Sequence, residues 1–138
     1  MTWTEIAGVS ARATGYLDGD GDLAAAYSAA DVFVLPTLAE NLPNGALESL
    51  ACGTPVIAFD VGGVGEVVRH METGYLAAAR DDADLAAGVR RLLEDETLRA
   101  RLGRHAREVA VAEYGLDLQR RRFTDLYHAV LGTATVAV

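Results

Sequence analysis

Two carboxylates lie eight positions apart in the chain, at Glu40 and Glu48. The segment that holds them follows an apolar, β-branched run and precedes a Gly-Thr-Pro turn. This order predicts a strand, a loop that carries the first acid and a helix that carries the second. Both acids would then lie at the carboxyl edge of a parallel sheet, where open α/β folds bind their ligands. There they could accept hydrogen bonds from ligand hydroxyl groups, although the spacing alone favours two solvated surface acids.

The composition limits the kind of protein this can be. With 138 residues, 51% of them hydrophobic, the chain can bury one core of ordinary size but not two. The net charge of −8 argues against a nucleic-acid-binding surface, because phosphate contacts need clustered positive charge. A single cysteine, Cys52, excludes an internal disulfide, and no apolar run approaches the roughly 20 residues of a membrane span. We therefore expect a cytoplasmic protein that binds no nucleic acid and contacts a membrane only through parts outside this sequence.

Short apolar runs alternate with helical patterns along the first half of the chain, an order that favours a parallel sheet covered by helices. The fold class we expect is therefore α/β, with about four strands. Four short apolar runs predict the strands: 14–17, 32–36, 55–59 and 74–77. Three segments between them predict helices: 23–30, 43–52 and 66–69.

Individual residues mark the ends of these elements. Asp22 can accept from the free amides of the first helix and so act as its cap. Pro43 suits the first position of the second helix, where its missing amide proton is no loss, and Gly53 should end that helix. The run 32–36 is continuous and β-prone, which is typical of a strand buried on both faces.

Three amphipathic helices should fill the C-terminal part. The first begins after the cap candidates Asp81 and Asp82, and the second spans roughly 97–113. The third starts near Asp117. It carries four apolar residues on one stripe: Phe123, Leu126, Tyr127 and Val130. We therefore expect one domain over residues 1–131 and an unstructured tail over residues 132–138.

Several motifs, taken in their order along the chain, resemble a known family of enzymes. They are Tyr27-Ser-Ala-Ala-Asp-Val-Phe-Val-Leu-Pro-Thr-Leu-Ala-Glu-Asn41, Glu48-Ser-Leu-Ala-Cys-Gly-Thr-Pro-Val-Ile-Ala58, Gly62-Gly63, Glu66 and Thr73-Gly-Tyr-Leu76. Together they resemble the donor-binding half of the retaining glycosyltransferases of family 4 (group 1), which have the GT-B fold. The resemblance covers the chain from about residue 14 to residue 131. It implies a partial Rossmann-like sheet, the second half of a GT-B C-terminal domain.

The resemblance also implies a role for each matching residue. Glu40 would reach the transferred sugar as the catalytic residue, and Glu48 would hold the ribose hydroxyls. The amides of Leu42 and Asn44, at the positive end of a helix dipole, would face the sugar or the diphosphate, whereas Pro43 cannot donate. A Gly-Gly turn would let the backbone approach the donor closely. The donor-binding residues implied in this way are Glu40, Asn41, Leu42, Pro43, Asn44, Glu48, Gly62 and Gly63.

The implied function is transfer of a hexosyl group from a nucleotide sugar to a glycan or lipid-linked acceptor, with retention, as in polysaccharide biosynthesis. The donor would be a UDP-, GDP- or ADP-sugar, which is a substrate, and no cofactor is implied. The residues leave two mechanisms open. A double displacement needs a nucleophile, for which Glu40 is the only candidate acid in the motif. In a front-face path the leaving phosphate deprotonates the incoming hydroxyl and the enzyme positions the sugar. The resemblance favours the front-face path.

Other motifs favour ordinary structural roles. Residues 18–22 look like the start of a calcium loop, but Leu23 takes the place that needs glycine and Ala29 the place that needs glutamate. The three histidines lie too far apart for a local ligand pair, so we expect no metal site. Residues 120–122 are three arginines on an amphipathic helix. Such arginines more often form a solvated face than contact an anionic membrane.

Two parts of the family pattern are absent from this sequence: an N-terminal domain that holds the acceptor, and an Arg and Lys pair that clamps the donor diphosphate. Residues 1–8 resemble the end of a helix that normally precedes the first strand. We therefore expect a fragment that is inactive alone and that works with an acceptor domain, in cis or in trans. The alternatives are a non-catalytic nucleotide-sugar-binding subunit and a scaffold remnant.

Overall fold

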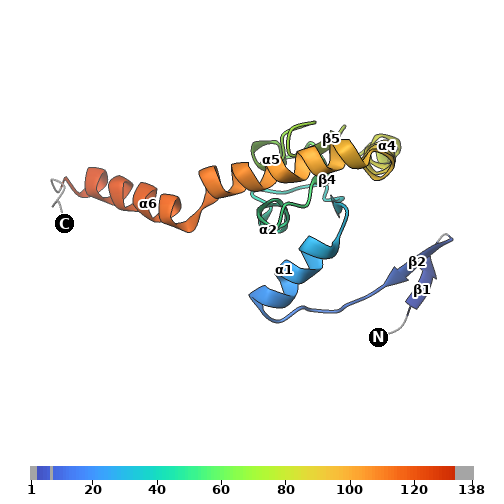
Figure 1. Ribbon diagram of the computed structural model, residues 1–138. Helices are drawn as coiled ribbons and strands as arrows, with labels where there is room; N and C mark the ends of the chain where they lie inside the picture. Colours follow the sequence, from blue (N-terminus) through green and yellow to red (C-terminus); the bar gives the residue numbers. More distant parts are fainter. Residues whose placement is uncertain (1–2, 7, 133–138) are drawn as a thin grey trace.

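The computed structural model describes residues 3–6 and 8–132, which form a three-stranded parallel sheet, six helices and a β-hairpin (Figure 1). In chain order the elements are β1 (Trp3–Ile6), β2 (Val9–Arg12), α1 (Asp20–Ala29), β3 (Phe33–Leu35), α2 (Asn44–Ala51), β4 (Val56–Phe59), α3 (Val64–Val67), β5 (Gly74–Ala77), α4 (Asp82–Glu94), α5 (Glu96–Tyr114) and α6 (Leu116–Leu131). The hairpin pairs β1 with β2 antiparallel, and the sheet has the order β3-β4-β5 with both pairs parallel. The expected α/β fold, a parallel sheet flanked by helices, is confirmed.

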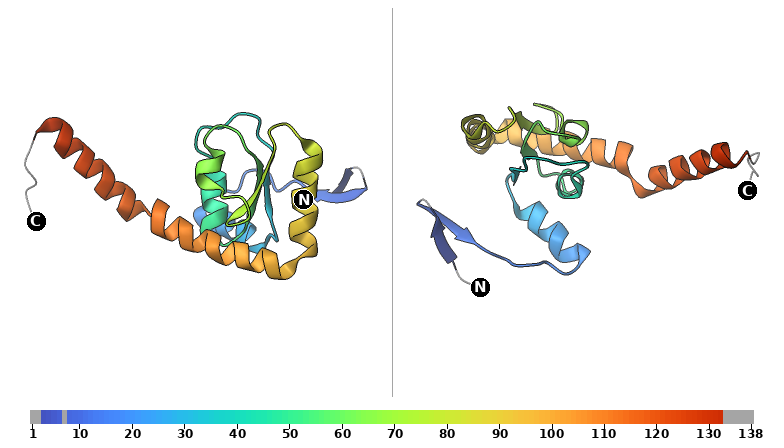
Figure 2. Two further views of the ribbon diagram at one scale, coloured as in Figure 1. Left: turned by 90° about the horizontal axis from the view of Figure 1, so that it is seen from above. Right: turned by 180° about the vertical axis from the view of Figure 1, so that it is seen from behind.

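The central strand β4 is the core of the fold, because each of its residues is buried. Its side chains alternate between the two faces of the sheet. Val56 and Ala58 pack in one cluster with residues of α2, α3 and α5. Ile57 packs in a second cluster with Leu92 of α4 and Leu102 of α5. Helices α2 and α4 therefore cover opposite faces, as Figure 2 shows, and the continuous apolar run of β4 is what a strand covered on both faces requires.

Helix α5 crosses the end of the sheet at which the strands begin (Figure 2). Gly103 packs against the carbonyl oxygen of Gly53, in the loop that leads into β4, and a Cβ atom at position 103 would overlap that oxygen. Arg107 donates to the carbonyl oxygen of Ala51 at the end of α2. Because α5 closes the amino ends of the strands, their carboxyl ends are left to the loops that carry the candidate site.

One carboxylate holds the turn from β5 into α4. Asp84 accepts from the hydroxyl of Tyr75 and from the amide of Ala78, both at 2.7 Å. Asp81 caps α4, as expected, by accepting from the amide of Asp84 at 3.0 Å. The bond from the Ala78 amide, followed by the one from Tyr75, lowers the pKa of Asp84 below its ordinary value of 3.8. Asp84 therefore stays ionised and keeps accepting both bonds at neutral pH.

Three expectations for the first strands are wrong. Residues 14–17 form no strand, because Gly15 takes a φ of +69°, a left-handed conformation that interrupts extended backbone. Residues 3–6 form β1 instead of the end of a helix, and the hairpin stands apart from the sheet (Figure 1). Strand β3 is not buried on both faces: in the described part of the chain it is an edge strand, and Val34 is 36% exposed.

The first three helices begin at other residues than expected. Helix α1 starts at Asp20 with Gly19 at its N-cap, so Asp22 lies inside the first turn, where its charge meets the helix dipole without capping. Pro43 is the N-cap residue of α2 and not its first helical residue, because its ψ of 100° is extended. Helix α3 covers Val64–Val67, so it starts two residues before the expected position.

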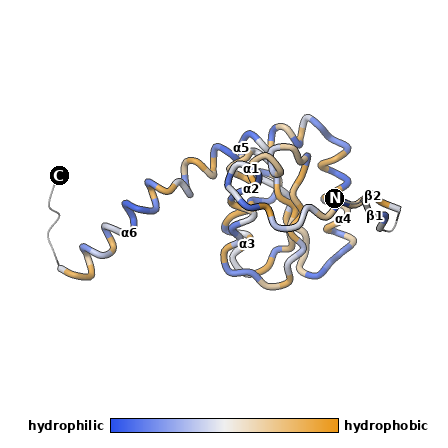
Figure 3. The backbone as a smooth tube through the Cα atoms, turned by 90° about the horizontal axis from the view of Figure 1, so that it is seen from below, coloured by the Kyte–Doolittle hydropathy of each residue, from blue (hydrophilic) through white to orange (hydrophobic). Residues whose placement is uncertain are grey.

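The three amphipathic helices of the C-terminal part are confirmed as α4, α5 and α6. Helix α6 projects away from the rest of the molecule, and hydrophobic and hydrophilic residues alternate along it (Figures 1 and 3). The apolar stripe expected on it is at least half exposed at each of its members: Phe123, Leu126, Tyr127 and Val130. Of the expected tail, residues 133–138 lie outside the described residues. Among the helices described, none combines the length and the apolar character needed to cross a membrane.

The packing of α5 against the loop before β4 can be tested with Gly103→Ala. The new methyl group would overlap a backbone carbonyl that cannot rotate away, so we expect a loss of about 2 kcal/mol in the free energy of unfolding. Gly21→Ala is the matched control, because a Cβ atom there meets open space inside α1 and should stabilise the helix by about 0.5 kcal/mol or more. Urea denaturation measures both, and equal stability of the two variants would contradict the packing described.

Candidate functional site

The loop after β3 and the turn after β4 are in contact through their backbones. The amide of Gly63 donates to the carbonyl oxygen of Glu40 at 3.2 Å. A Cβ atom at Gly62 would overlap that same oxygen, and one at Gly63 would overlap the carbonyl oxygen of Asn41. Only glycine allows so close an approach, and Gly62 also has a φ of +52°. The two glycines therefore hold the Glu40 loop at the carboxyl end of the sheet.

The carboxylate of Glu40 is half-buried beside this contact. Its Oε1 accepts from the amide of Asn41 at 3.0 Å. The bond ties the side chain to its own loop and leaves the second oxygen, Oε2, for a ligand. The orientation of the Glu40 carboxylate thus depends on the same backbone segment that the two glycines hold.

Helix α2 begins at this site with free amides. Its N-cap residue, Pro43, is buried, offers no side-chain cap and accepts from the amides of Ala46 and Leu47 through its carbonyl at 3.0 and 3.2 Å. Leu42 and Asn44, on either side of the proline, are exposed. The first amides of an uncapped helix carry partial positive charge and can bind an anionic group.

A cavity of about 550 Å³ opens between the start of α2 and the junction of α5 with α6. Leu42 and Asn44 belong to its wall on the side of the site. Tyr114, Arg122 and Phe123 line the opposite wall. The exposed residues around Pro43 therefore border this cavity as well as the candidate site.

Glu48 comes from the middle of α2 and is exposed. Its Oε2 accepts from the hydroxyl of Tyr27, in α1, at 3.2 Å. The Tyr27 ring packs edge-on against Phe33 of β3, with ring centroids 5.2 Å apart. Burial of Tyr27, followed by the negative charge of Glu48, raises the pKa of its hydroxyl above the ordinary value of 10.0. The hydroxyl therefore keeps its proton at neutral pH and remains a donor to Glu48.

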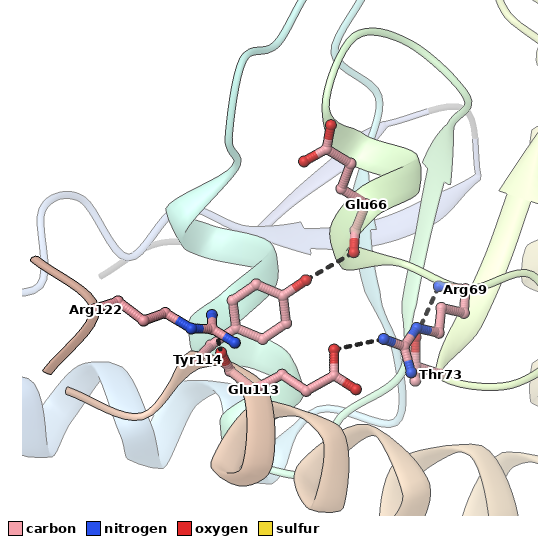
Figure 4. A network of polar contacts seen from close by, with 6 residues as sticks. All are labelled: Glu66, Arg69, Thr73, Glu113, Tyr114 and Arg122. Carbon is pink, nitrogen blue, oxygen red and sulfur yellow. Dashed lines mark hydrogen bonds and ion pairs between the residues drawn. The ribbon is translucent and has the colours of Figure 1, made fainter. Parts of the chain in front are cut away.

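A polar network ties the short helix α3 to the end of α5 (Figure 4). The hydroxyl of Tyr114 donates to the carbonyl oxygen of Glu66 at 2.7 Å. Arg69 pairs with Glu113 at 2.6 Å, and the backbone amide of Arg69 donates to the hydroxyl of Thr73 at 2.9 Å. Because α3 follows directly on the Gly-Gly turn, these bonds anchor the far side of that turn. The carboxylate of Glu66 takes no part in them: its residue contributes a carbonyl oxygen and lies in the first turn of α3.

The structure brings the expected site residues together in two groups. Glu40 and Asn41 contact the Gly-Gly turn through their backbones. The sequence predicted that this turn would approach a donor, and the structure shows that it approaches the Glu40 loop. Leu42, Pro43, Asn44 and Glu48 lie on or just before α2. Within the residues that the structure describes, no three His, Cys, Asp or Glu side chains gather as metal ligands would.

Tyr27 and Tyr114 are the residues of this region that the sequence reasoning missed. Tyr27 stands at the start of a quoted motif but lies 21 positions from Glu48, so no local spacing links the two. Tyr114 lies 48 positions from Glu66. Such contacts depend on how helices pack, and periodicity within one helix gives no indication of them.

Comparisons with known proteins show what this chain is similar to. A family model described as "Glycosyl transferases group 1" matches residues 5–109. Among curated proteins, the chain is similar to the N,N'-diacetylbacillosaminyl-diphospho-undecaprenol alpha-1,3-N-acetylgalactosaminyltransferase of Campylobacter jejuni, with 31% identity over 123 residues, 89% of this chain and 32% of that protein. The chain spans about a third or less of the length of the curated relatives it matches.

Among the solved structures that are similar in fold, two illustrate the match. Sucrose-phosphate synthase from Thermosynechococcus elongatus superposes with a TM-score of 0.77 at 37% identity, over 81% of this chain and 28% of that one. HepE from Anabaena, in complex with UDP-glucose, gives a TM-score of 0.74 at 22% identity, over 78% of this chain and 30% of that one. The second likeness, at its low identity, shows the fold alone.

Gly63→Ala tests the backbone contact at the site. The added methyl group would overlap the carbonyl of Asn41, so we expect the free energy of unfolding to fall by about 1 to 3 kcal/mol. Amide resonances of residues 40–42 should shift as the loop moves away. Gly65→Ala is the control: its Cβ would meet the end of the Asp60 side chain at 3.1 Å, which can rotate. Unchanged resonances in Gly63→Ala would refute the contact.

Proposed function

The chain belongs to the glycosyl transferases of group 1 and has the fold of the C-terminal half of a GT-B enzyme, and on this basis we propose that it binds the nucleotide-sugar donor of a retaining hexosyltransferase. The acceptor would be a glycan or a lipid-linked acceptor. The single observation that carries the proposal is the contact of the Glu40 loop with the Gly-Gly turn, beside the uncapped start of α2. It places a carboxylate and free helix amides at the carboxyl edge of the sheet, where α/β folds bind ligands.

The proposed roles follow from the chemistry of each group. Glu48, exposed on α2, would accept from the two vicinal hydroxyls of the ribose, since charge-assisted bonds of this kind are about twice as strong as neutral ones. Glu40 would accept from the transferred hexose through its free oxygen. The amides at Asn44 and after it would face the diphosphate, whose charge suits the positive end of a helix dipole. The base could be uracil, guanine or adenine, and HepE binds UDP-glucose.

For the reaction we propose the front-face path. The bond between the anomeric carbon and the diphosphate oxygen breaks while the acceptor oxygen bonds to the same face of that carbon. The acceptor proton passes to the leaving diphosphate oxygen. Glu40 acts as the residue that positions the sugar, because its Oε1 is already bound to the Asn41 amide and the remaining oxygen suits hydrogen bonding to a hydroxyl.

Catalysis would need more than these 138 residues. The diphosphate that departs carries negative charge, and losing its stabilisation by basic groups costs several kcal/mol of barrier, on the order of 3 to 4 kcal/mol per lost donor. The sequence has no lysine to serve in the Arg and Lys pair of the family pattern. We propose that this chain alone binds the donor and that an acceptor domain, in cis or in trans, completes the enzyme.

Donor binding can be tested by calorimetric titration with UDP-, GDP- and ADP-glucose. At least one should bind, and Glu48→Ala should weaken it by about tenfold or more, because charge-assisted hydrogen bonds to the ribose are lost. Glu94→Ala is the matched control, since it removes an exposed glutamate from the end of a helix remote in sequence from the site. Binding of none of the three donors above the level of Glu48→Ala would refute the donor site.

Inactivity of the chain by itself is a separate prediction. Incubated with the donor that binds, the 138-residue chain should release no free hexose above the rate in buffer. Chromatography of the released sugar measures this. Hydrolysis by the chain that disappears in Glu40→Ala would show that these residues are catalytically competent without a second domain.

A further inference from the structure

Tyr27, on the short helix α1, is held at three points. Its carbonyl oxygen accepts from the hydroxyl of Thr54 at 2.7 Å, which links the end of α1 to the loop before β4. Its ring meets Phe33 edge-on, at an interplanar angle of 90°. Its hydroxyl donates to Oε2 of Glu48 at 3.2 Å. The backbone, the ring and the hydroxyl are thus each fixed by a different element.

The loop that fixes the backbone of Tyr27 is itself fixed to α2. The hydroxyl of Ser49, which is buried, donates to the carbonyl oxygen of Thr54 at 3.0 Å. Ser49 follows Glu48 directly in α2. The segment that carries Glu48 and the residue that bonds its carboxylate are therefore parts of one closed set of contacts, running from Ser49 through Thr54 to Tyr27 and back to Glu48.

Glu48, in contrast, has an exposed side chain with several rotatable bonds. A free glutamate of this kind samples many rotamers, and binding a ligand costs the entropy of fixing one of them. The Tyr27 hydroxyl occupies one lone pair of Oε2 and leaves Oε1 free. The carboxylate is thereby pre-oriented before any ligand arrives.

We propose that Tyr27 is a positioning residue that orients the Glu48 carboxylate toward the vicinal diol of a ribonucleotide and so sets the preference of the chain for ribose over deoxyribose. The inference rests on the proposed function, because it takes Glu48 as the ribose ligand. Tyr27 itself does not touch the ligand. It acts through the single bond to Glu48, and its raised pKa keeps the donor proton in place at neutral pH.

The test compares each ligand with its counterpart that lacks both ribose hydroxyls. UDP, GDP and ADP are titrated beside their 2′,3′-dideoxy analogues. The measured quantity is the ratio of the dissociation constant of the dideoxy analogue to that of the ribonucleotide. For the nucleotide that binds, the unaltered chain should prefer the ribonucleotide by about tenfold or more. Tyr27→Phe keeps the ring and removes the hydroxyl. It should lower this ratio by about threefold to tenfold through weaker ribonucleotide binding, with the dideoxy analogue bound as before.

The control is Tyr16→Phe, which removes the hydroxyl of a tyrosine that is 92% exposed, and its ratio should stay unchanged. Thermal unfolding of Tyr27→Phe checks that the fold is kept. If Tyr27 had a merely structural role, Tyr27→Phe would weaken the binding of both ligands equally. An unchanged ratio with weaker binding of both would therefore overturn the inference while leaving donor binding intact. If the unaltered chain shows no ribose preference, or if Glu48→Ala keeps it, the proposed role of Glu48 fails and the inference fails with it.

Discussion

The backbone contact between the Glu40 loop and the Gly-Gly turn is the constraint on which the site depends. It joins the segments that follow two adjacent strands, β3 and β4, at the carboxyl ends of these strands. Helix α5 covers the opposite, amino ends. Because the contact is made by backbone atoms, side-chain rotation cannot relieve a clash there, and positions 62 and 63 tolerate only the smallest residue. The Glu40 loop, the Glu40 carboxylate and the start of α2 are consecutive parts of the chain. Loss of the backbone contact would therefore displace all three together.

The opposite side of the same turn is anchored by the last residues of α5. Tyr114 bonds to α3, the helix that the turn leads into, and Glu113 pairs with Arg69 just after that helix. The middle of α5 packs against the loop before β4. One long helix thus fixes the beginning and the end of the βα unit that carries the turn. This explains why a four-residue helix, too short to be stable alone, can form a reliable boundary of the site.

Much of the fold could be predicted where the pattern is local. Strand β5 and the helices α4 and α5 form where apolar spacing places them, because each of them buries its own run or stripe. Helix α6 also forms where it was expected, although its apolar stripe is exposed. The failures share a different cause. The segment 14–17 is apolar enough for a strand, but Gly15 turns the backbone to a positive φ. Strand β3 has the composition of a buried strand, and only its position at the sheet edge leaves Val34 exposed. Neither the φ of Gly15 nor the position of β3 at the edge of the sheet is visible in the periodicity of the sequence, which is the signal that predicts the other elements.

The candidate site was likewise predictable only in part. Its glutamates and glycines could be found from their motifs, but the partner that orients each glutamate could not. Glu40 is bound by the next amide of its own loop, whereas Glu48 is bound by a tyrosine from another helix. Two acids that look equivalent in the sequence therefore respond to different parts of the structure. The orientation of the first carboxylate depends on its own loop, and that of the second depends on a side chain from α1. If the two carboxylates meet different portions of one donor, as proposed, sugar and ribose recognition can change independently, because the seven residues between them span the boundary between a loop and a helix.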